Sequence, residues 1–155
     1  RLHMTNAIEL VEQKEQPVLS IRKTTSMANL QQELGKAFGA VMQHLGALGE
    51  QPAGPVFAAY YNMDMQALDV EMGVLVSKPV PGKGEITSTA IPAGKQVAGI
   101  FQGPYSKMEP FYKSMTDWMT TNGLIPTGVV YEFYLNSPME VAESELLTKV
   151  VFPVK

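Results

Sequence analysis

Glu132 is the residue whose type and position most clearly suggest chemistry. It lies in the middle of residues 129–136, VVYEFYLN, where branched and aromatic residues are typical of a β-strand. A carboxylate in an apolar strand is costly unless it meets a partner. Because side chains alternate along a strand, Glu132 shares its face with Tyr134. A carboxylate beside aromatic rings could bind an organic cation, or could act as a general base.

The chain contains an internal repeat. The segment 49–80 aligns with the segment 123–154 without a gap, and eleven of the aligned positions are identical. Matching glycines and prolines mark matching turns. Glu71 matches Glu145, which favours a structural role for both, such as a surface ion pair or a charge on an edge strand.

The same offset relates two amphipathic helices. We predict them over residues 27–48 and 106–121, with Ser26 and Ser106 as N-caps. The glycines that follow them, Gly49 and Gly123, are expected to be the C-terminal caps. The apolar stripes are Leu34, Phe38, Val41 and Leu45 in the first helix and Met108, Tyr112, Met115 and Met119 in the second.

Each repeat is predicted as strand, helix, strand, strand. Strands are expected over residues 16–24, 55–62, 70–77, 128–136 and 145–154, with one strand and a short extra one within residues 85–103. This order favours an α+β fold with pseudo-two-fold symmetry: antiparallel sheets, helices on one side, and a ligand cleft between the repeats.

The predicted domain boundaries follow from the repeat. We expect a single domain over residues 4–155, with repeats at about 8–80 and 85–155. Residues 1–3 resemble a cloning remnant before Met4 and are left out of the functional reasoning.

Composition excludes several classes of function. The chain has 155 residues, a net charge of −3 and no cluster of lysine or arginine, which argues against nucleic acid as its main partner. There are no cysteines, and the two histidines show no metal-ligand spacing, so neither a metal nor another cofactor is expected. No apolar run approaches the length of a membrane-spanning helix and no secretory signal is evident, so we expect a cytoplasmic protein without membrane contact.

The repeat suggests how a site could be built around Glu132. The face with Tyr131 and Phe133 is the more apolar and is expected to face the helix, which leaves the Glu132 face open. Tyr134 matches Tyr60, whereas Glu132 matches Ala58, so one repeat would offer a carboxylate and the other would offer room.

Further candidate ligand-binding residues lie on or near the second helix. Trp118 and Phe111 break the repeat, because their counterparts are His44 and Ala37. Tyr105 follows a Gly-Pro pair at the helix start and is a candidate to line the pocket. Each could also be an aromatic at the rim of the core. Tyr112 lies on the apolar stripe and is interpreted as a core residue.

The chain resembles the GyrI-like small-molecule-binding superfamily. The resemblance rests on the doubled unit and on the segments FQGPYSKMEPFYKSMTDWM, YEFYLNSP and ELLTKVVFPV, and it spans residues 9–155. This family includes effector-binding domains of multidrug-sensing transcription regulators and gyrase-inhibitor-like proteins. The resemblance implies a ligand cleft between two repeats and places Glu132 in it.

The resemblance leaves three functions open. The first is binding of an amphipathic, cationic small molecule, with Glu132 as counter-ion among Tyr60, Tyr134 and Trp118. The second is a hydrolase of strained or electrophilic molecules that uses the same glutamate. The third is a protein-interaction or inhibitor role of the gyrase-inhibitor type.

The partners expected from the sequence follow the first function. No helix-turn-helix segment precedes the domain in this sequence, so we expect no direct nucleic-acid binding by the chain itself. A homodimer or a regulator acting in trans remains an alternative partner.

Overall fold

The computed structural model describes residues 7–155, so the predicted remnant at residues 1–3 and the expected domain start at residue 4 lie outside the described part. The chain forms two compact units. One is Lys14–Ala93. The other combines Gly94–Lys155 with the N-terminal segment that ends at Gln13.

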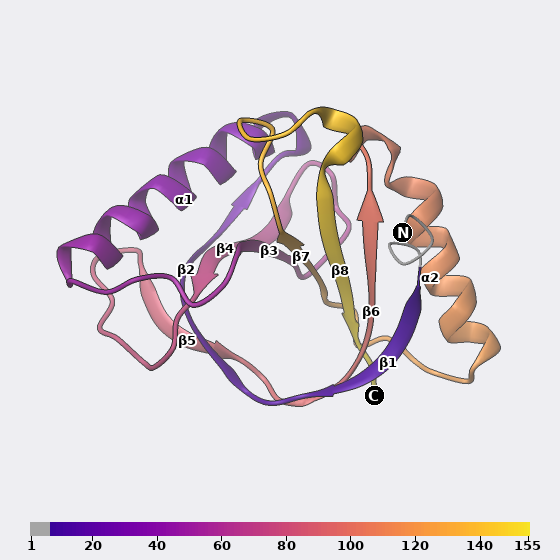
Figure 1. The fold of residues 1–155 in the computed structure, drawn as a ribbon. Helices are drawn as coiled ribbons and strands as arrows, with labels where there is room; N and C mark the ends of the chain where they lie inside the picture. Colours follow the sequence, from indigo (N-terminus) through magenta and orange to yellow (C-terminus); the bar gives the residue numbers. More distant parts are fainter. Residues whose placement is uncertain (1–6) are drawn as a thin grey trace. The chain divides into compact units, whose positions relative to one another are not determined.

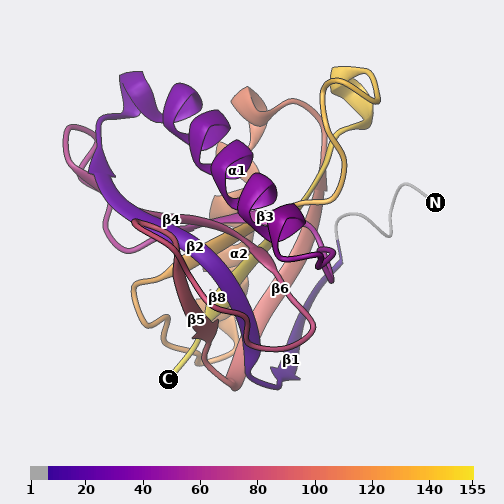
Figure 2. The same ribbon diagram turned by 90° about the vertical axis from the view of Figure 1, so that its left-hand side faces the viewer.

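The unit Lys14–Ala93 is an antiparallel sheet with one long helix. The strand order is β3-β4-β2-β5, and α1 lies across β2 and β4 (Figure 2). Its elements are β2 (Gln16–Thr25), a 3₁₀ turn (Met27–Asn29), α1 (Leu30–Ala47), β3 (Val56–Tyr60), β4 (Leu68–Leu75) and β5 (Thr87–Ile91).

The second unit has the same plan. Its strand order is β1-β6-β8-β7, and α2 runs beside β6 (Figure 1). Its elements are β1 (Ile8–Gln13), β6 (Gly94–Gln102), a 3₁₀ turn (Tyr105–Lys107), α2 (Glu109–Thr121), β7 (Val130–Tyr134), a 3₁₀ turn (Glu143–Glu145) and β8 (Leu147–Pro153).

The predicted α+β class and the strand-helix-strand-strand order are confirmed, including the short extra strand, which is β5. The sequence interpretation did not include β1. This strand precedes β2 in the chain but pairs with β6, whereas β5 precedes β6 but pairs with β2. The segment before β2 thus provides β1, the edge strand of the unit that contains β6. The segment before β6 provides β5, the edge strand of the unit that contains β2. An origin of the two units by duplication stays a prediction.

Three of the four predicted helix caps are confirmed. Ser26 Oγ accepts a hydrogen bond from the backbone N–H of Asn29 at 3.2 Å. Gly49 and Gly123 have φ angles of +73° and +69°, the left-handed conformation of a C-terminal cap. The prediction for Ser106 is wrong, because Ser106 lies inside the 3₁₀ turn Tyr105–Lys107 that precedes α2.

Strand register corrects the gapless repeat alignment. That alignment matches Ala59 with Phe133 and Glu71 with Glu145. In the sheets, Ala59 pairs with Glu71, whereas Phe133 pairs with Lys149, so Lys149 takes the place of Glu71. The connection between β7 and β8 is therefore four residues longer than the connection between β3 and β4, because position 149 stands where the gapless alignment expects position 145. Five chance identities beyond Asn62 obscure this insertion in the sequence.

The loop contacts show the same insertion. The amide of Asn62 donates to the Ala67 carbonyl at 3.1 Å, and the amide of Asn136 donates to the Glu145 carbonyl at 3.0 Å. The gapless alignment matches Asn62 with Asn136 correctly, but it matches Ala67 with Val141. The structural counterpart of Glu145 is thus Ala67, not Glu71.

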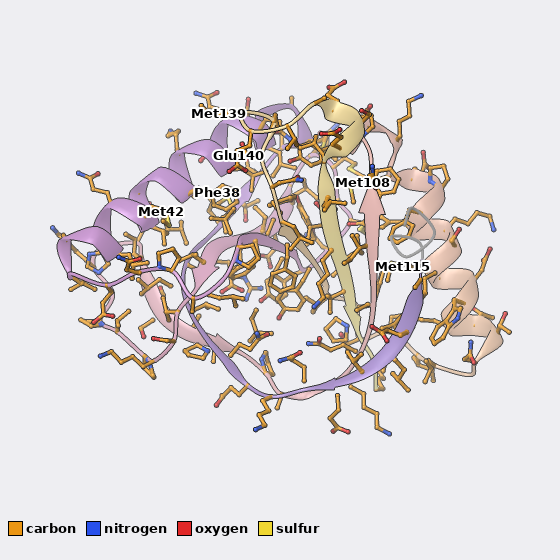
Figure 3. All side chains as sticks on the ribbon, viewed as in Figure 1. Phe38, Met42, Met108, Met115, Met139 and Glu140 are labelled. Carbon is orange, nitrogen blue, oxygen red and sulfur yellow. The ribbon has the colours of Figure 1, made fainter. Side chains whose placement is uncertain are left out.

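The two helices bury the predicted apolar stripes. Leu34, Val41 and Leu45 are buried on α1, and Met108, Met115 and Met119 are buried at the start and along α2 (Met108 and Met115 are labelled in Figure 3). The fourth stripe position, Phe38 on α1 and Tyr112 on α2, is half-buried in each unit. Among the described helices, none has both the length and the hydropathy needed to cross a membrane.

Candidate functional site

Glu132 in β7 is held by two tyrosine hydroxyls. Tyr134 Oη donates a hydrogen bond to Glu132 Oε1 at 2.7 Å. Tyr112 Oη, which comes from α2, donates to Glu132 Oε2. The carboxylate is half-buried, and these two bonds satisfy part of its hydrogen-bonding capacity. Both oxygens of the group are therefore fixed in direction before any ligand arrives.

The bond from Tyr112 shows that α2 covers the Glu132 face of the sheet. Phe111, the neighbour of Tyr112 on α2, lies against Gly99 on the same face of β6. The prediction that the helix packs on the Tyr131 and Phe133 face is wrong. Tyr131 and Phe133 are 4% and 7% exposed, so β7 is buried on both faces and apolarity does not reveal which one carries the helix.

Tyr105 extends the aromatic environment of Glu132. Its ring meets the ring of Tyr134 edge-on, with 5.8 Å between the centroids. Burial first, and the negative charge of Glu132 second, raise the pKa of Tyr105 above its ordinary value of 10.0. The Tyr105 phenol is therefore neutral at physiological pH, and it adds an aromatic surface to the site without adding charge.

The carboxylate of Glu132 keeps acceptor capacity. A carboxylate offers about four lone-pair sites, and two are used here. Within the described residues no lysine, arginine or histidine forms an ion pair with Glu132. No group of three or more potential metal ligands occurs in residues 7–155 either. The arrangement suits a positively charged organic group better than a metal ion.

The structure places the other predicted residues at different distances from this centre. Tyr105 and Tyr134 lie in it, whereas Phe111 is 7% exposed and packs on Phe101 with 5.6 Å between ring centroids. Trp118 is half-buried on α2. At about 100° per residue it projects roughly 120° away from Tyr112 around the helix axis. Phe111 is thus a core residue of its unit, and Trp118 lies on a different side of α2 from Tyr112.

Tyr60 and Ala58 belong to the unit Lys14–Ala93 and lie on its α1 face. Tyr60 pairs with Val70, and Val70 pairs with Lys23, whose amine reaches Glu33 of α1 at 3.4 Å. Ala58 is fully buried on the same face. The predicted equivalence of Ala58 with Glu132 therefore holds in the structure: each faces the helix of its own unit.

Sequence reasoning placed Tyr112 in the core and missed its bond to Glu132. The signal was present in the repeat, because the counterpart of Tyr112 is Phe38. The second unit adds a hydroxyl at this stripe position and a carboxylate in β7. Two polar additions in the same repeat, one on the helix and one on a strand, indicate a bonded pair.

A second carboxylate cluster lies in the unit Lys14–Ala93, on the face away from α1. Glu71 is 8% exposed and accepts hydrogen bonds from Ser20 Oγ and Tyr61 Oη, both at 2.6 Å. Arg22 covers the Tyr61 ring at 3.8 Å and donates two hydrogen bonds to Asp69. The expectation of a surface role for Glu71 is wrong, because β4 is a central strand and its partners enclose the carboxylate.

The sequence profile of the GyrI-like small molecule binding domain matches residues 6–155. The chain belongs to this family. The match covers almost the whole sequence and includes residues of both units. No curated protein sequence matches the chain significantly.

Solved structures share the GyrI-like fold. The C-terminal domain of EcmrR is similar with a TM-score of 0.81 and 23% identity, over 96% of this chain and 97% of that one. EcmrR in its complex with DNA gives a TM-score of 0.83 and 24% identity. The match covers 96% of this chain and 57% of the EcmrR chain in that complex.

Two further structures are more distant in sequence. A hydrolase from Listeria innocua has a TM-score of 0.70 and 14% identity, over 97% of this chain and 93% of that one. SAV2435, in a structure with tetraphenylphosphonium bound, has a TM-score of 0.64 and 11% identity, over 96% of this chain and 94% of that one. At these identities the similarity establishes the GyrI-like fold.

Proposed function

We propose that this GyrI-like domain binds an amphipathic organic cation, with Glu132 as the counter-ion. The observation that carries the proposal is the tyrosine-held carboxylate: Glu132 is half-buried, bonded to Tyr112 and Tyr134, and not paired with a basic side chain among the described residues. A carboxylate in such a position gains from a cation that reaches it.

The aromatic rings around Glu132 favour the same class of ligand. Tyr105 and Tyr134 offer ring surface beside the carboxylate. Each ring face attracts a desolvated cation by about 0.5–2 kcal/mol. The bound tetraphenylphosphonium of SAV2435, a protein of the same fold, supports an aromatic cation as the first ligand to try.

The test is a titration of the domain with tetraphenylphosphonium by calorimetry. Glu132→Gln keeps the size of the side chain and removes its charge. We expect this variant to weaken binding by about 1–3 kcal/mol. Binding of the neutral analogue triphenylphosphine oxide is expected to change little. An equal loss for the cation and the neutral compound would contradict a counter-ion role.

Glu71→Gln provides a matched control. Glu71 also accepts bonds from two hydroxyl groups, but it lies in the other unit on the face away from α1. This variant is expected to bind tetraphenylphosphonium as the wild type does. A loss as large as that of Glu132→Gln would show that any buried charge in the domain affects binding, and would remove the special role of Glu132.

The hydrogen bond between Tyr112 and Glu132 also favours a second candidate, a hydrolase. Here the Glu132 carboxylate takes a proton from water, the water oxygen attacks an epoxide carbon, and the released alkoxide is protonated by a tyrosine hydroxyl. The fold is shared with the hydrolase from Listeria innocua. Turnover of styrene oxide that is lost in Glu132→Gln and slowed in Tyr112→Phe would establish this function; no turnover by the wild type would count against epoxide hydrolysis at Glu132.

The assembly that uses the domain belongs to the proposal as well. EcmrR combines the same fold with DNA binding in one chain. We infer that this domain serves as an effector-binding part, within a longer regulator or beside a partner that reads DNA.

A further inference from the structure

Thr148 in β8 carries a buried hydroxyl that makes no hydrogen bond within the described residues. Its side chain is 0% exposed. Buried polar groups in proteins are nearly always paired, because an unpaired one is destabilising. A valine would fill the same space without that penalty. The hydroxyl therefore needs an explanation.

Thr148 lies on the α2 face, in the same part of the sheet as Glu132. It pairs with Tyr134 on one side and with Phe101 on the other, so the three side chains point the same way. Glu132 pairs with Val150, the next residue on that face of β8, and is thus the diagonal neighbour of Thr148. Diagonal neighbours in antiparallel strands have their Cβ atoms roughly 7 Å apart.

The other unit shows what this position looks like without the hydroxyl. Val70 pairs with Tyr60 as Thr148 pairs with Tyr134, and Val70 is also 0% exposed. Three counterparts on this face thus gain polar atoms: Phe38 becomes Tyr112, Ala58 becomes Glu132 and Val70 becomes Thr148. Tyr112 and Glu132 form a hydrogen bond with each other. The Thr148 hydroxyl has no hydrogen-bond partner within the described residues, so no protein contact accounts for its presence.

We propose that Thr148 is a specificity-determining residue of the Glu132 site, and that the ligand is an organic cation with an oxygen acceptor several ångströms from its charge. The inference rests on the proposed binding of a cation at Glu132. The cation lies at the carboxylate, and the oxygen accepts a hydrogen bond from Thr148 Oγ1. Tyr134 is half-buried directly opposite Thr148, and its hydroxyl bonds Glu132; a cation that replaces this bond at the carboxylate and shifts the Tyr134 ring brings its oxygen to the hydroxyl. Aryl esters of quaternary amino alcohols have this chemistry.

Two matched cations test the proposal. Benzoylcholine carries an ester between its phenyl ring and its quaternary nitrogen, and (4-phenylbutyl)trimethylammonium has the same chain length without oxygen. We expect the wild-type domain to bind benzoylcholine more tightly. In Thr148→Val this preference should fall about 3- to 10-fold, the value of one hydrogen bond, while the affinity for the phenylbutyl cation stays unchanged.

Two further measurements separate recognition from structure. Thr148→Ser keeps the hydroxyl and should retain most of the preference for benzoylcholine. Thr148→Val removes an unpaired polar group and should be at least as stable as the wild type in urea, so a folded protein is available for the titration.

The outcomes are distinct. If the wild type binds both cations equally, or if Thr148→Val keeps the preference, the role of Thr148 is overturned while the counter-ion role of Glu132 stands. If neither these cations nor tetraphenylphosphonium bind to the wild type, the proposed function fails and the inference fails with it.

Discussion

The two units differ at equivalent positions of the same framework. On the helix-covered face of Lys14–Ala93, Phe38, Ala58 and Val70 are apolar (Figure 3 shows Phe38 extending from α1). Their counterparts in the other unit form or border the hydroxyl-bonded carboxylate. The difference teaches that a carboxylate on the helix-covered face of such a sheet is accompanied by hydroxyl donors, here one from the helix and one from the strand itself.

The largest effect is expected from transferring the carboxylate alone. Ala58 is fully buried, and Phe38 has no hydroxyl to offer a glutamate at this position. Ala58→Glu should therefore lower the free energy of unfolding by about 3–5 kcal/mol, as for a buried charge that lacks one of its partners. Urea unfolding followed by circular dichroism measures the loss.

Adding the donor should recover part of that loss. The double variant Phe38→Tyr/Ala58→Glu is expected to be more stable than Ala58→Glu by at least about 1 kcal/mol. Phe38→Tyr alone serves as the control. A double variant that is no more stable than Ala58→Glu would show that the tyrosine donor does not account for the difference between the two units.

The next effect concerns the two glutamates that the sequence pairs and the structure separates. Glu71→Ala leaves the hydroxyls of Ser20 and Tyr61 without their acceptor and should cost about 2–3 kcal/mol of stability. Glu145→Ala changes an exposed side chain and should cost less than about 0.5 kcal/mol. Equal losses of stability in thermal unfolding would contradict the strand register, which makes Lys149 and not Glu145 the structural counterpart of Glu71.

A smaller loss is expected when the second unit is made to resemble the first. Tyr112→Phe places the Phe38 side chain opposite Glu132 and removes one of its two donors. The loss should be about 1–2 kcal/mol, because water reaches the half-buried carboxylate and replaces part of the bond. A chemical denaturation curve indistinguishable from that of the wild type would show that Tyr134 alone suffices.

The smallest effect is a pH dependence of Tyr105. Its pKa is raised by burial and then by the charge of Glu132, so the stability that it contributes is complete below pH 10.0 and is lost as the pH rises through the raised pKa. Glu132→Gln removes the charge and keeps the burial, so the pKa of Tyr105 should fall part of the way toward its ordinary value. Ultraviolet titration of tyrosinate, with Tyr105→Phe to assign the signal, measures the shift. An unchanged titration would show that the Glu132 charge does not reach Tyr105.

Much of the fold could be predicted from local patterns. Both helices could be predicted from the apolar stripes that include Leu34 and Met115 and from the glycine caps. The spacing of apolar residues and the conformational preference of glycine are local properties of the sequence. The edge strand β1 was missed, since Ile8–Gln13 is short and only partly buried and pairs with a strand that follows the whole unit Lys14–Ala93 in sequence. The insertion between β7 and β8 was missed because a lengthened loop leaves no periodic trace.

For the site, the sequence determined the unusual residue. Glu132 stands out because a carboxylate interrupts an apolar strand and because its repeat counterpart is Ala58. Only the tertiary structure decided what meets it. A strand buried on both faces has the same alternation whichever face the helix covers, so the bond from Tyr112, and the place of Thr148 beside Tyr134, follow from long-range packing and register.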